Sequence, residues 1–569
     1  SAFRFLSMAA PETGLIRYCI VALNKDIEIE YTPYLDGNVV NEDANWNEVF
    51  WTQVYNEAED NQGYIISRTL KTEFDVACGM HTVSYINGTE IKEKSVNHTE
   101  SGYAETKWSI HLPKESQLEI IKYVAVLSSL NHSKEDLLSD TKNTLKATAA
   151  KGFSAMLDDH RKIWSGIWEH SDVIIEGDDD AQQGIRFNIF HLNQTYRGDD
   201  PRLNIGPKGF TGEKYGGSTY WDTEAFCIPF FLCTAPASVT RNLLLYRYRH
   251  LEKAIENARK LGFSNGAALY PMVTMNGEEC HNEWEITFEE IHRNGAIAFA
   301  IYNYIRHTGD NQYLIDYGLE VLIAVSRFWS QRVNWSAEKM KYVILGVTGP
   351  NEYENNVNNN WYTNTIAVWT LEYTIDSIDI AKKTNPVKYE SIRKSTDFEE
   401  IQEIARWKDI ISKMYFPYYE PEGVFLQQDG YMDKEQMKVT RLDPSQRPLN
   451  QKWSWDRILR SCFIKQADVL HGIYLFEDKY DTDTIERNFT FYESRTVHES
   501  SLSPCIHAVL AARIRKIDLA YNLYLRTSRL DLDDYNHEVH EGLHITSMAG
   551  TYMSVVEGFA GKRIKNGML

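Results

Sequence analysis

The sequence predicts a multidomain protein in which an incomplete N-terminal antiparallel β-sandwich and a helical linker precede an (α/α)6 barrel. The first observation is the length of 569 residues, which exceeds what one hydrophobic core supports. The second is a change of period, because apolar and polar residues alternate from about 15 to 127 and helical spacing follows. The third is the alternation of short and long loops between the predicted helices, which is typical of a double ring with its long loops at one face.

The predicted domains follow from these patterns. Residues 1–132 carry period-two runs broken by turns such as Asn87-Gly88, which indicates hairpins of an antiparallel sandwich. Residues 133–176 predict a linker of one or two helices. Residues 177–560 contain roughly eleven or twelve helical segments and predict the barrel. A helical repeat array is the alternative, but no motif recurs at a fixed period.

Both ends of the chain read as truncated. Residue 1 is a Ser that begins strand-like text without a Met or signal peptide, so the first strands of the sandwich are expected to be missing. Residues 561–569 read as the start of a truncated C-terminal β-domain.

Charge and cysteine content exclude several classes of function. The net charge of −20 argues against a nucleic-acid partner, because phosphate backbones require basic patches. The absence of an apolar window of about eighteen residues argues against a membrane-spanning segment. Seven Cys without paired C-x-x-C spacing indicate reduced thiols, a cytoplasmic location and no structural zinc.

The segment 347–364 is the first candidate site. It contains seven Asn, the carboxylates Glu352 and Glu354 and the aromatic residues Tyr353, Trp361 and Tyr362. Amides and acids bind sugar hydroxyls, and aromatic rings stack on sugar faces, so the segment favours a carbohydrate site with a proton donor. The alternative is an Asn-rich surface loop with a helix cap.

Two Trp–acid pairs form further candidates. Trp221 and Asp222 begin a predicted helix after a Gly-rich loop, where the ring would support a sugar and the acid would accept from its hydroxyls. The alternative is an acid that pairs with the helix dipole. Trp284 and Glu285 form the second pair, beside Cys280, in a spacing that matches no metal motif, so no metal is predicted.

Polar residues near three other predicted helices complete the set. Lys465 and Gln466 fall inside an apolar helix, 456–475, where they need polar partners along the barrel axis or form a buried ion pair. Ser500 and Ser501 precede a helix with Ser503 as its N-cap, and His544 begins the last helix. Hydroxyls, a helix N-terminus and a His are sufficient to bind phosphate.

Four motifs together resemble glycoside hydrolase family 65, a family of inverting disaccharide phosphorylases of α-glucosides with some hydrolases. They are Tyr220–Glu224, Gly349–Tyr353, Lys465–Val469 and His498–Ser503. The resemblance covers nearly the whole chain, and segments 281–288, 530–536 and 542–548 look most like those of members that cleave maltose. It implies an N-terminal β-sandwich, linker helices, an (α/α)6-barrel catalytic domain, a C-terminal β-domain and a homodimer.

The resemblance also implies a chemistry. Glu352 matches the general acid, and Ser500, Ser501 and His544 match the ligands of inorganic phosphate, which is the co-substrate, with no other cofactor. The residues that match the subsite of the transferred glucose are Trp221, Asp222, Trp284, Glu285, Lys465 and Gln466. The expected products are β-glucose 1-phosphate and glucose, formed where the acid and the phosphate site face each other across one pocket.

Three alternatives remain at this point. The disaccharide could be nigerose, kojibiose or trehalose, because such members share the catalytic residues. A family hydrolase would use Glu499 as a base, although retention of both Ser500 and Ser501 argues against it. A silent carbohydrate-binding protein would need neither Glu352 nor an anion site.

Overall fold

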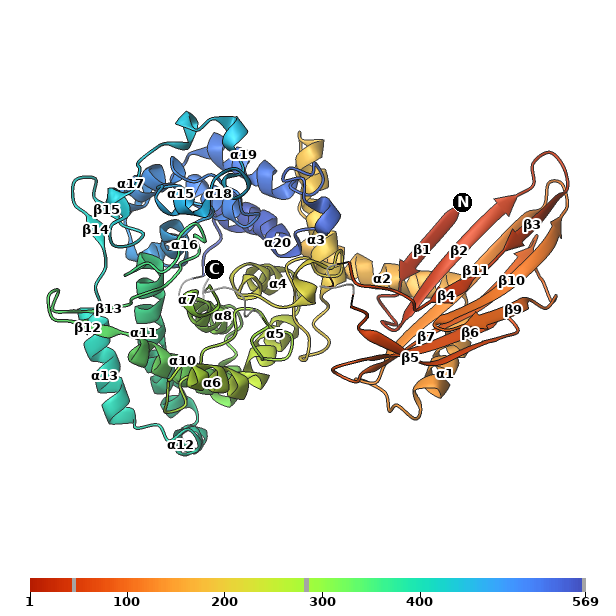
Figure 1. Ribbon diagram of the computed structural model, residues 1–569, viewed down its shortest axis with the longest axis horizontal. Coiled ribbons are helices and arrows are strands. Elements are labelled where there is room, and N and C mark those ends of the chain that lie inside the picture. Colours follow the sequence, from red (N-terminus) through yellow and green to blue (C-terminus); the bar gives the residue numbers. More distant parts are fainter. Residues whose placement is uncertain (43, 45–47, 281–285, 565–569) are drawn as a thin grey trace. The chain divides into compact units, whose positions relative to one another are not determined.

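The computed structural model of the protein describes residues 1–569 except 43, 45–47, 281–285 and 565–569. The chain forms two compact units, Ser1–His170 and Ser171–Leu569, which are described separately (Figure 1). Within the described residues, no helix has both the length and the apolar character needed to cross a membrane.

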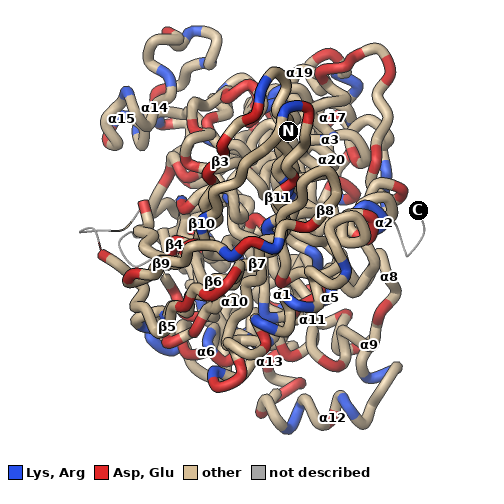
Figure 2. Tube along the Cα trace, turned by 90° about the vertical axis from the view of Figure 1, so that its right-hand side faces the viewer, with Lys and Arg blue, Asp and Glu red and all other residues tan. Residues whose placement is uncertain are grey.

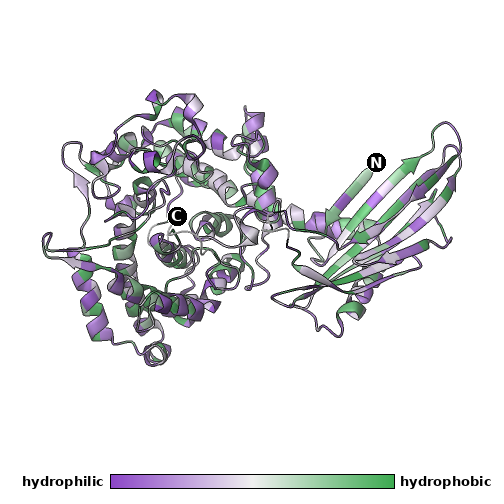
Figure 3. Ribbon diagram, in the orientation of Figure 1, coloured by the Kyte–Doolittle hydropathy of each residue, from purple (hydrophilic) through white to green (hydrophobic). Residues whose placement is uncertain are grey.

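The first unit contains two antiparallel sheets, as the alternating pattern predicts. One has the order β1 (Ala2–Leu6), β2 (Thr13–Val21), β11 (Gln117–Ser128), β7 (Asp75–Ile86), β6 (Gln62–Thr69) and β5 (Trp51–Glu59), with β8 (Thr89–Glu90) beside β7. The other has the order β3 (Ile27–Tyr31), β10 (Tyr103–Leu112) and β4 (Tyr34–Asp36), with β9 (Val96–Glu100) beside β10. Figure 3 shows the alternation of hydrophobic and hydrophilic residues along these strands.

Two helices belong to this unit, where the sequence predicted a separate linker over 133–176. Helix α1 (Leu137–Lys151) packs on β7 and β11, and α2 (Phe153–Ser171) follows it. Leu137 and Leu145 are fully buried in one core with Tyr64 and Tyr123 of the larger sheet. The apolar face of α1 therefore covers the sheet, and the boundary between the units lies after α2.

The second unit is the predicted double ring of helices. The inner ring runs α4 (Ile228–Thr234), α8 (Arg293–Thr308), α11 (Trp361–Thr384), α16 (Val469–Leu475), α18 (Ser503–Arg513) and α20 (Ile545–Met553), and α20 packs back on α4. Figure 1 shows these helices around a common centre. Most of their side chains are buried all round, as expected for helices enclosed by a second layer.

Each of the six longer helices of the outer layer packs against one or two helices of the inner ring. These six are α3 (Asp179–Thr195), α5 (Ala237–Arg249), α10 (Leu319–Arg332), α13 (Glu400–Lys413), α17 (Thr482–Glu493) and α19 (Ile517–Ser528). Shorter helices are α6 (Leu251–Lys260), α7 (Ile286–Glu289), α9 (Asn311–Tyr313), α12 (Pro386–Ser395), α14 (Leu449–Lys452) and α15 (Trp455–Leu459). Short strands are β12 (Asn334–Ser336), β13 (Lys341–Val343), β14 (Tyr418–Tyr419) and β15 (Val424–Phe425).

One predicted helix, 456–475, is wrong in its middle. The chain leaves α15 at Leu459 and re-enters a helix only at Val469, so Lys465 and Gln466 lie in a non-helical segment. The Lys465 backbone N–H donates to Asn351 Oδ1 at 2.8 Å, and its carbonyl accepts from the Glu499 N–H at 3.2 Å. These bonds to distant segments replace the helical ones that the apolar pattern suggested.

Candidate active site

A cavity of about 400 Å³ lies where the loops lead into the inner-ring helices. Its walls come from the segments before α4, α8, α11, α16, α18 and α20, so the N-terminal ends of these helices converge on it. Every predicted site residue that the structure describes lines it: Trp221, Asp222, Glu352, Lys465, Gln466, Ser500, Ser501 and His544. Residues far apart in the sequence therefore meet in one pocket.

Glu352 lies in a turn on one side of this cavity. Its carboxylate accepts a hydrogen bond from the Lys465 ammonium and keeps 28% of its side-chain surface exposed. Burial alone would lower the pKa of Lys465, but the Glu352 carboxylate raises that pKa above its ordinary value. Lys465 therefore carries a positive charge that holds Glu352 in place.

Buried polar groups fix the loop that carries Glu352. The Asp468 carboxylate accepts from Asn360 Nδ2 at 3.0 Å and from the Asn351 N–H at 3.3 Å. Burial raises the pKa of Asp468 to about 7. On the other side, Glu289 accepts from the Thr348 hydroxyl at 2.7 Å. These hydrogen bonds within the protein hold the loop in this shape.

The aromatic residues of this loop serve different purposes from those predicted. Trp361 is 2% exposed and stacks on Phe425 with ring centroids 4.6 Å apart, and Tyr362 is fully buried in the first turn of α11. Both rings fill the interior, and Tyr353 is the aromatic of the three that lines the cavity. The sequence shows three rings near an acid but not which of them the helix turns inward.

Trp221 and Asp222 also line the cavity. Asp222 accepts a hydrogen bond from the Thr546 hydroxyl at 3.0 Å. Burial, together with the nearby Glu352 charge, raises the pKa of Asp222 to about 7 despite that bond. The Trp221 ring packs edge-on against His292 at 4.9 Å, which fixes its orientation. A buried acid beside an indole suits a sugar ring with its hydroxyls.

The two serines precede the inner helix α18. The Ser500 hydroxyl accepts from the Leu502 N–H at 3.2 Å, and both serines line the cavity. Helix α18 begins at Ser503 as predicted, but its N-cap is Leu502, so the predicted cap at Ser503 is wrong. The Ser503 hydroxyl instead bonds His498 Nδ1 at 2.8 Å, which leaves the first N–H groups of α18 near the serine pair.

His544 is the N-cap residue of α20. Its Nδ1 lies 2.7 Å from Asp531 Oδ1 and its Nε2 lies 3.1 Å from Glu538 Oε2. Burial acts to lower the pKa of His544, but these two carboxylates raise it above the ordinary value. An imidazole with a raised pKa at the start of α20 suits the binding of an anion such as phosphate.

Lys208 is a site residue that the sequence reasoning missed. Its ammonium is 3.2 Å from His544 Nε2 and donates to the Gly542 carbonyl at 2.9 Å, with the residue only 3% exposed. Burial lowers the pKa of Lys208, and the nearby Asp531 partly offsets this. A lysine in the short Pro207-Lys208-Gly209 run before a Gly-rich loop was the available signal.

Tyr353 belongs to the candidate segment 347–364, and the other cavity residues were not singled out as site residues. They are Pro207, Tyr215, Tyr220, Met272, Ile286, Asn450, Trp455, Leu502 and Thr546. Tyr215, which precedes Gly216 and Gly217, has a φ of 65°, a conformation that is rare for a side chain with Cβ and is often found at functional sites.

Two predicted residues, Trp284 and Glu285, lie outside the described residues. Glu499, the base of the hydrolase alternative, does not line the cavity. Its carboxylate is 6% exposed and accepts from Tyr353, Arg447 and the Leu449 N–H. All of these donors hold it in the wall, so it does not face the position of an attacking water.

Comparison with known protein families identifies the family of this chain. Residues 186–553 match the central catalytic domain of glycosyl hydrolase family 65, and residues 1–167 match the N-terminal domain of the same family. The chain belongs to glycosyl hydrolase family 65. The matched catalytic region contains all of the described residues that line the cavity.

Relatives within family 65 cover almost the whole chain. The chain is 51% identical over 564 residues to a maltose phosphorylase of Bacillus subtilis, a match that spans 99% of the chain and 72% of the relative. It is 34% identical to an α,α-trehalose phosphorylase of Thermoanaerobacter brockii, a match that spans 99% of the chain and 73% of the relative. A solved structure assigned as a kojibiose phosphorylase from the human microbiome matches with a TM-score of 0.90 and 30% identity. The match covers 99% of this chain and 73% of that structure's chain.

Three side chains of types that can bind metal lie close together near the serine loop of this family 65 chain. Glu493, His498 and His507 have ligand atoms within 4.8 Å of one another. These residues also bond each other, because Glu493 contacts His507 Nδ1 and lies 3.4 Å from His498 Nε2. Their hydrogen bonds anchor the loop, which explains the group without a metal ion.

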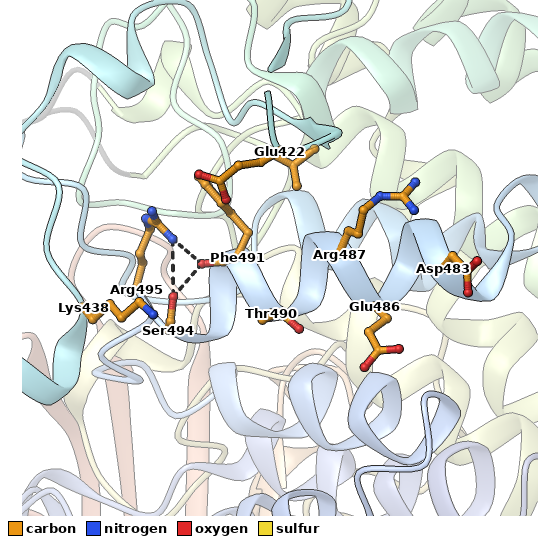
Figure 4. Close-up of a pocket in the computed structure, with 10 residues that line it drawn as sticks. Glu422, Lys438, Asp483, Glu486, Arg487, Thr490, Phe491, Ser494 and Arg495 are labelled. Carbon is orange, nitrogen blue, oxygen red and sulfur yellow. Dashed lines mark hydrogen bonds between the residues drawn. The ribbon is translucent and has the colours of Figure 1, made fainter. Parts of the chain in front are cut away.

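A second hollow of about 720 Å³ lies on the outer surface of the barrel, beside α17 (Figure 4). Its lining residues are Glu422, Val424, Lys438, Asp483, Glu486, Arg487, Thr490, Phe491, Ser494 and Arg495. None of the predicted site residues belongs to it. Acidic and basic residues both occur at many places along the trace in Figure 2, and both also line the groove.

Proposed function

We propose that the protein phosphorolyses maltose with inversion, giving β-D-glucose 1-phosphate and D-glucose. The observation that carries this proposal is one cavity in which Glu352 lies with the anion-binding residues Ser500, Ser501, His544 and Lys208. The 51% identity to a maltose phosphorylase over 99% of the chain supports maltose as the disaccharide.

The proposed reaction has two coupled events. Glu352 transfers its proton to the glycosidic oxygen, and the bond from C1 to that oxygen breaks as glucose leaves. A phosphate oxygen attacks C1 from the opposite face and forms the new C1–O bond, which inverts the configuration. The proton released by phosphate restores the Glu352 carboxyl, so the atoms and charges balance without a second carboxylate.

Each side chain has a proposed task in this reaction. Ser500, Ser501, His544 and Lys208 bind phosphate through hydroxyls and positive charge, aided by the N-termini of α18 and α20. Residues proposed to bind the transferred glucose are Trp221, Asp222, Trp284, Glu285, Lys465 and Gln466. Inorganic phosphate is the co-substrate, and we propose that no other cofactor takes part.

The hydrolase alternative has no support from the site. The Glu499 carboxylate is held by wall residues, whereas a base for water must face the sugar. We further propose a homodimer in a reducing, cytoplasmic environment. The seven cysteines, all of them described, are free, which is compatible with that environment.

Release of glucose from maltose, measured with and without inorganic phosphate, tests the proposed function. Phosphate-dependent release with formation of glucose 1-phosphate is expected. Trehalose, kojibiose and nigerose in parallel reactions decide the disaccharide, because the relatives include phosphorylases of all three sugars. Phosphate-independent release would identify a hydrolase, and no release from any sugar would contradict the proposal.

A further inference from the structure

We propose that Glu499 is a positioning residue that sets the acid loop and the phosphate loop at a fixed separation through its hydrogen bond with Tyr353. The proposal rests on the proposed function, because it concerns how the two halves of that active site are aligned. It gives a role to the carboxylate next to the serine pair that the reaction itself leaves unused.

The contacts of Glu499 connect three walls of the cavity. Its Oε2 accepts from the Tyr353 hydroxyl and from the Leu449 N–H at 2.9 Å, and its Oε1 accepts from Arg447 Nε at 3.2 Å. In addition, the Glu499 backbone N–H donates to the Lys465 carbonyl at 3.2 Å. A single residue therefore bonds to three segments that are distant in the sequence.

Three of these partners lie at the cavity wall. Tyr353, next to Glu352, and Lys465 line the cavity, and Leu449 precedes the lining residue Asn450. Glu499 itself precedes the lining residue Ser500. Lys465 also donates to the Glu352 carboxylate through its ammonium. A shift of the Glu499 carboxylate would therefore be passed to the acid, to the serines and to the Asn450 wall at the same time.

Burial makes these bonds strong and directional. Glu499 is 6% exposed and Tyr353 is 1% exposed, so little water competes for the carboxylate. Hydrogen bonds to an ionised group are shorter and about twice as strong as neutral ones. Since the acid and the nucleophile act on opposite faces of one carbon, a misplacement of about 1 Å between them can cost on the order of a hundredfold in rate.

Tyr353→Phe tests the proposal most cleanly, because it removes one hydroxyl and preserves the ring that lines the cavity. We expect kcat to fall about tenfold and the KM for phosphate to rise, in line with the loss of one hydrogen bond to a charged group, while the KM for maltose changes little. Tyr389→Phe is the matched control, since Tyr389 is equally buried and donates to Glu400 at 2.7 Å away from the cavity.

Thermal unfolding separates positioning from stability. Both variants lose one Tyr–Glu hydrogen bond, so a similar decrease in Tm is expected for both and a loss of activity only for Tyr353→Phe. Glu499→Gln should impair turnover in the same way. The turnover of the double variant should be no lower than that of the less active single variant, because both changes act through one bond. Activity losses that simply follow Tm, or additive losses in the double variant, would overturn the proposal.

Calorimetric titration with inorganic phosphate keeps this test separate from the proposed function. If the wild-type protein does not cleave maltose with phosphate, the proposed function is wrong, yet phosphate affinity still reports on the serine loop. Weaker phosphate binding by Tyr353→Phe than by Tyr389→Phe supports the positioning role. Equal phosphate binding and equal turnover in the two variants would contradict it.

Discussion

The cavity at the inner ring and the groove beside α17 differ in how deeply their polar groups are buried. The groove is the larger hollow, at about 720 Å³ against about 400 Å³, but its charged side chains are exposed or half-buried. Arg495 bonds the Phe491 carbonyl at 2.8 Å and Gln436 at 3.2 Å, and it lies over the Phe491 ring (Figure 4). The exposed Arg487 bonds Thr484 one turn earlier at 3.0 Å and the Gly423 carbonyl at 3.3 Å. The groove is an ordinary solvated surface.

The cavity has the opposite character. Asp222 is buried with a pKa raised to about 7, and Lys208 is buried beside the N-cap His544. The partners of these groups come from other segments of the barrel, such as Thr546 for Asp222. Burial of polar groups is unfavourable unless they are bonded, so their concentration at converging helix N-termini marks a functional site more reliably than volume does.

The largest expected effect comes from Glu352→Gln. The amide retains the shape and the hydrogen-bonding capacity but cannot donate the proton, so turnover of maltose with phosphate should fall by at least about 10²–10⁴-fold. Maltose affinity, measured by calorimetry, should change little. The control is Glu403→Gln, which breaks a buried pair with Arg327 outside the cavity and should reduce Tm but not turnover. Near-normal turnover by Glu352→Gln would rule out this residue as the acid.

Lys208→Met should have the next largest effect. Loss of the buried ammonium removes a charged hydrogen-bond donor beside His544, so the KM for phosphate should rise roughly tenfold or more while that for maltose is nearly constant. Lys122→Met is a suitable control, because Lys122 lies in the sheet unit and its pKa is also lowered by burial. A phosphate KM equal in both variants would show that Lys208 only supports the fold.

Ser501→Ala should have a smaller effect in the same direction. A neutral hydroxyl contributes less than a charge, so the phosphate KM should rise about threefold to tenfold, with kinetics compared at two maltose concentrations. If the serine serves only the helix start, the change should instead cost about 1 kcal/mol of stability without a phosphate-specific effect. Ser326→Ala, which removes a buried hydroxyl bonded to Thr374, provides the stability reference.

The smallest effect is expected in the groove. Arg487→Ala removes an exposed side chain that bonds Thr484 and the Gly423 carbonyl away from the cavity, so both KM values and kcat should remain within about twofold of the wild type. Steady-state kinetics at saturating and limiting phosphate measure this directly. A specific change in sugar affinity would show that the groove takes part in binding and would undermine the comparison.

The sequence was sufficient to predict which residues meet but not how each is held. The fold class follows from the change of period, and Glu352, Ser500 and His544 were predicted on motifs that the folded chain brings to one cavity. Lys465 was misplaced in a helix because its backbone bonds to Asn351 and Glu499 form across the barrel. Hydrogen bonds between distant segments leave no periodic pattern, so propensity could not reveal them.

Lys208 and Trp455 show a second limit. Both line the cavity, yet each lies in a stretch without chemical neighbours in the sequence, and only the closure of the inner ring places Lys208 next to His544. The separation of 336 positions between these two residues cannot be read from local spacing. Side chains that lie outside recognisable motifs therefore require the structure.

The configuration of the sugar phosphate is the most direct test of the central claim that Glu352 and the phosphate site act on opposite faces of one sugar. Proton NMR spectra recorded in the first minutes of maltose cleavage in phosphate buffer distinguish the two anomers of glucose 1-phosphate. Attack opposite the acid predicts the β anomer as the first product. Initial formation of the α anomer, or of glucose without any sugar phosphate, would contradict the account.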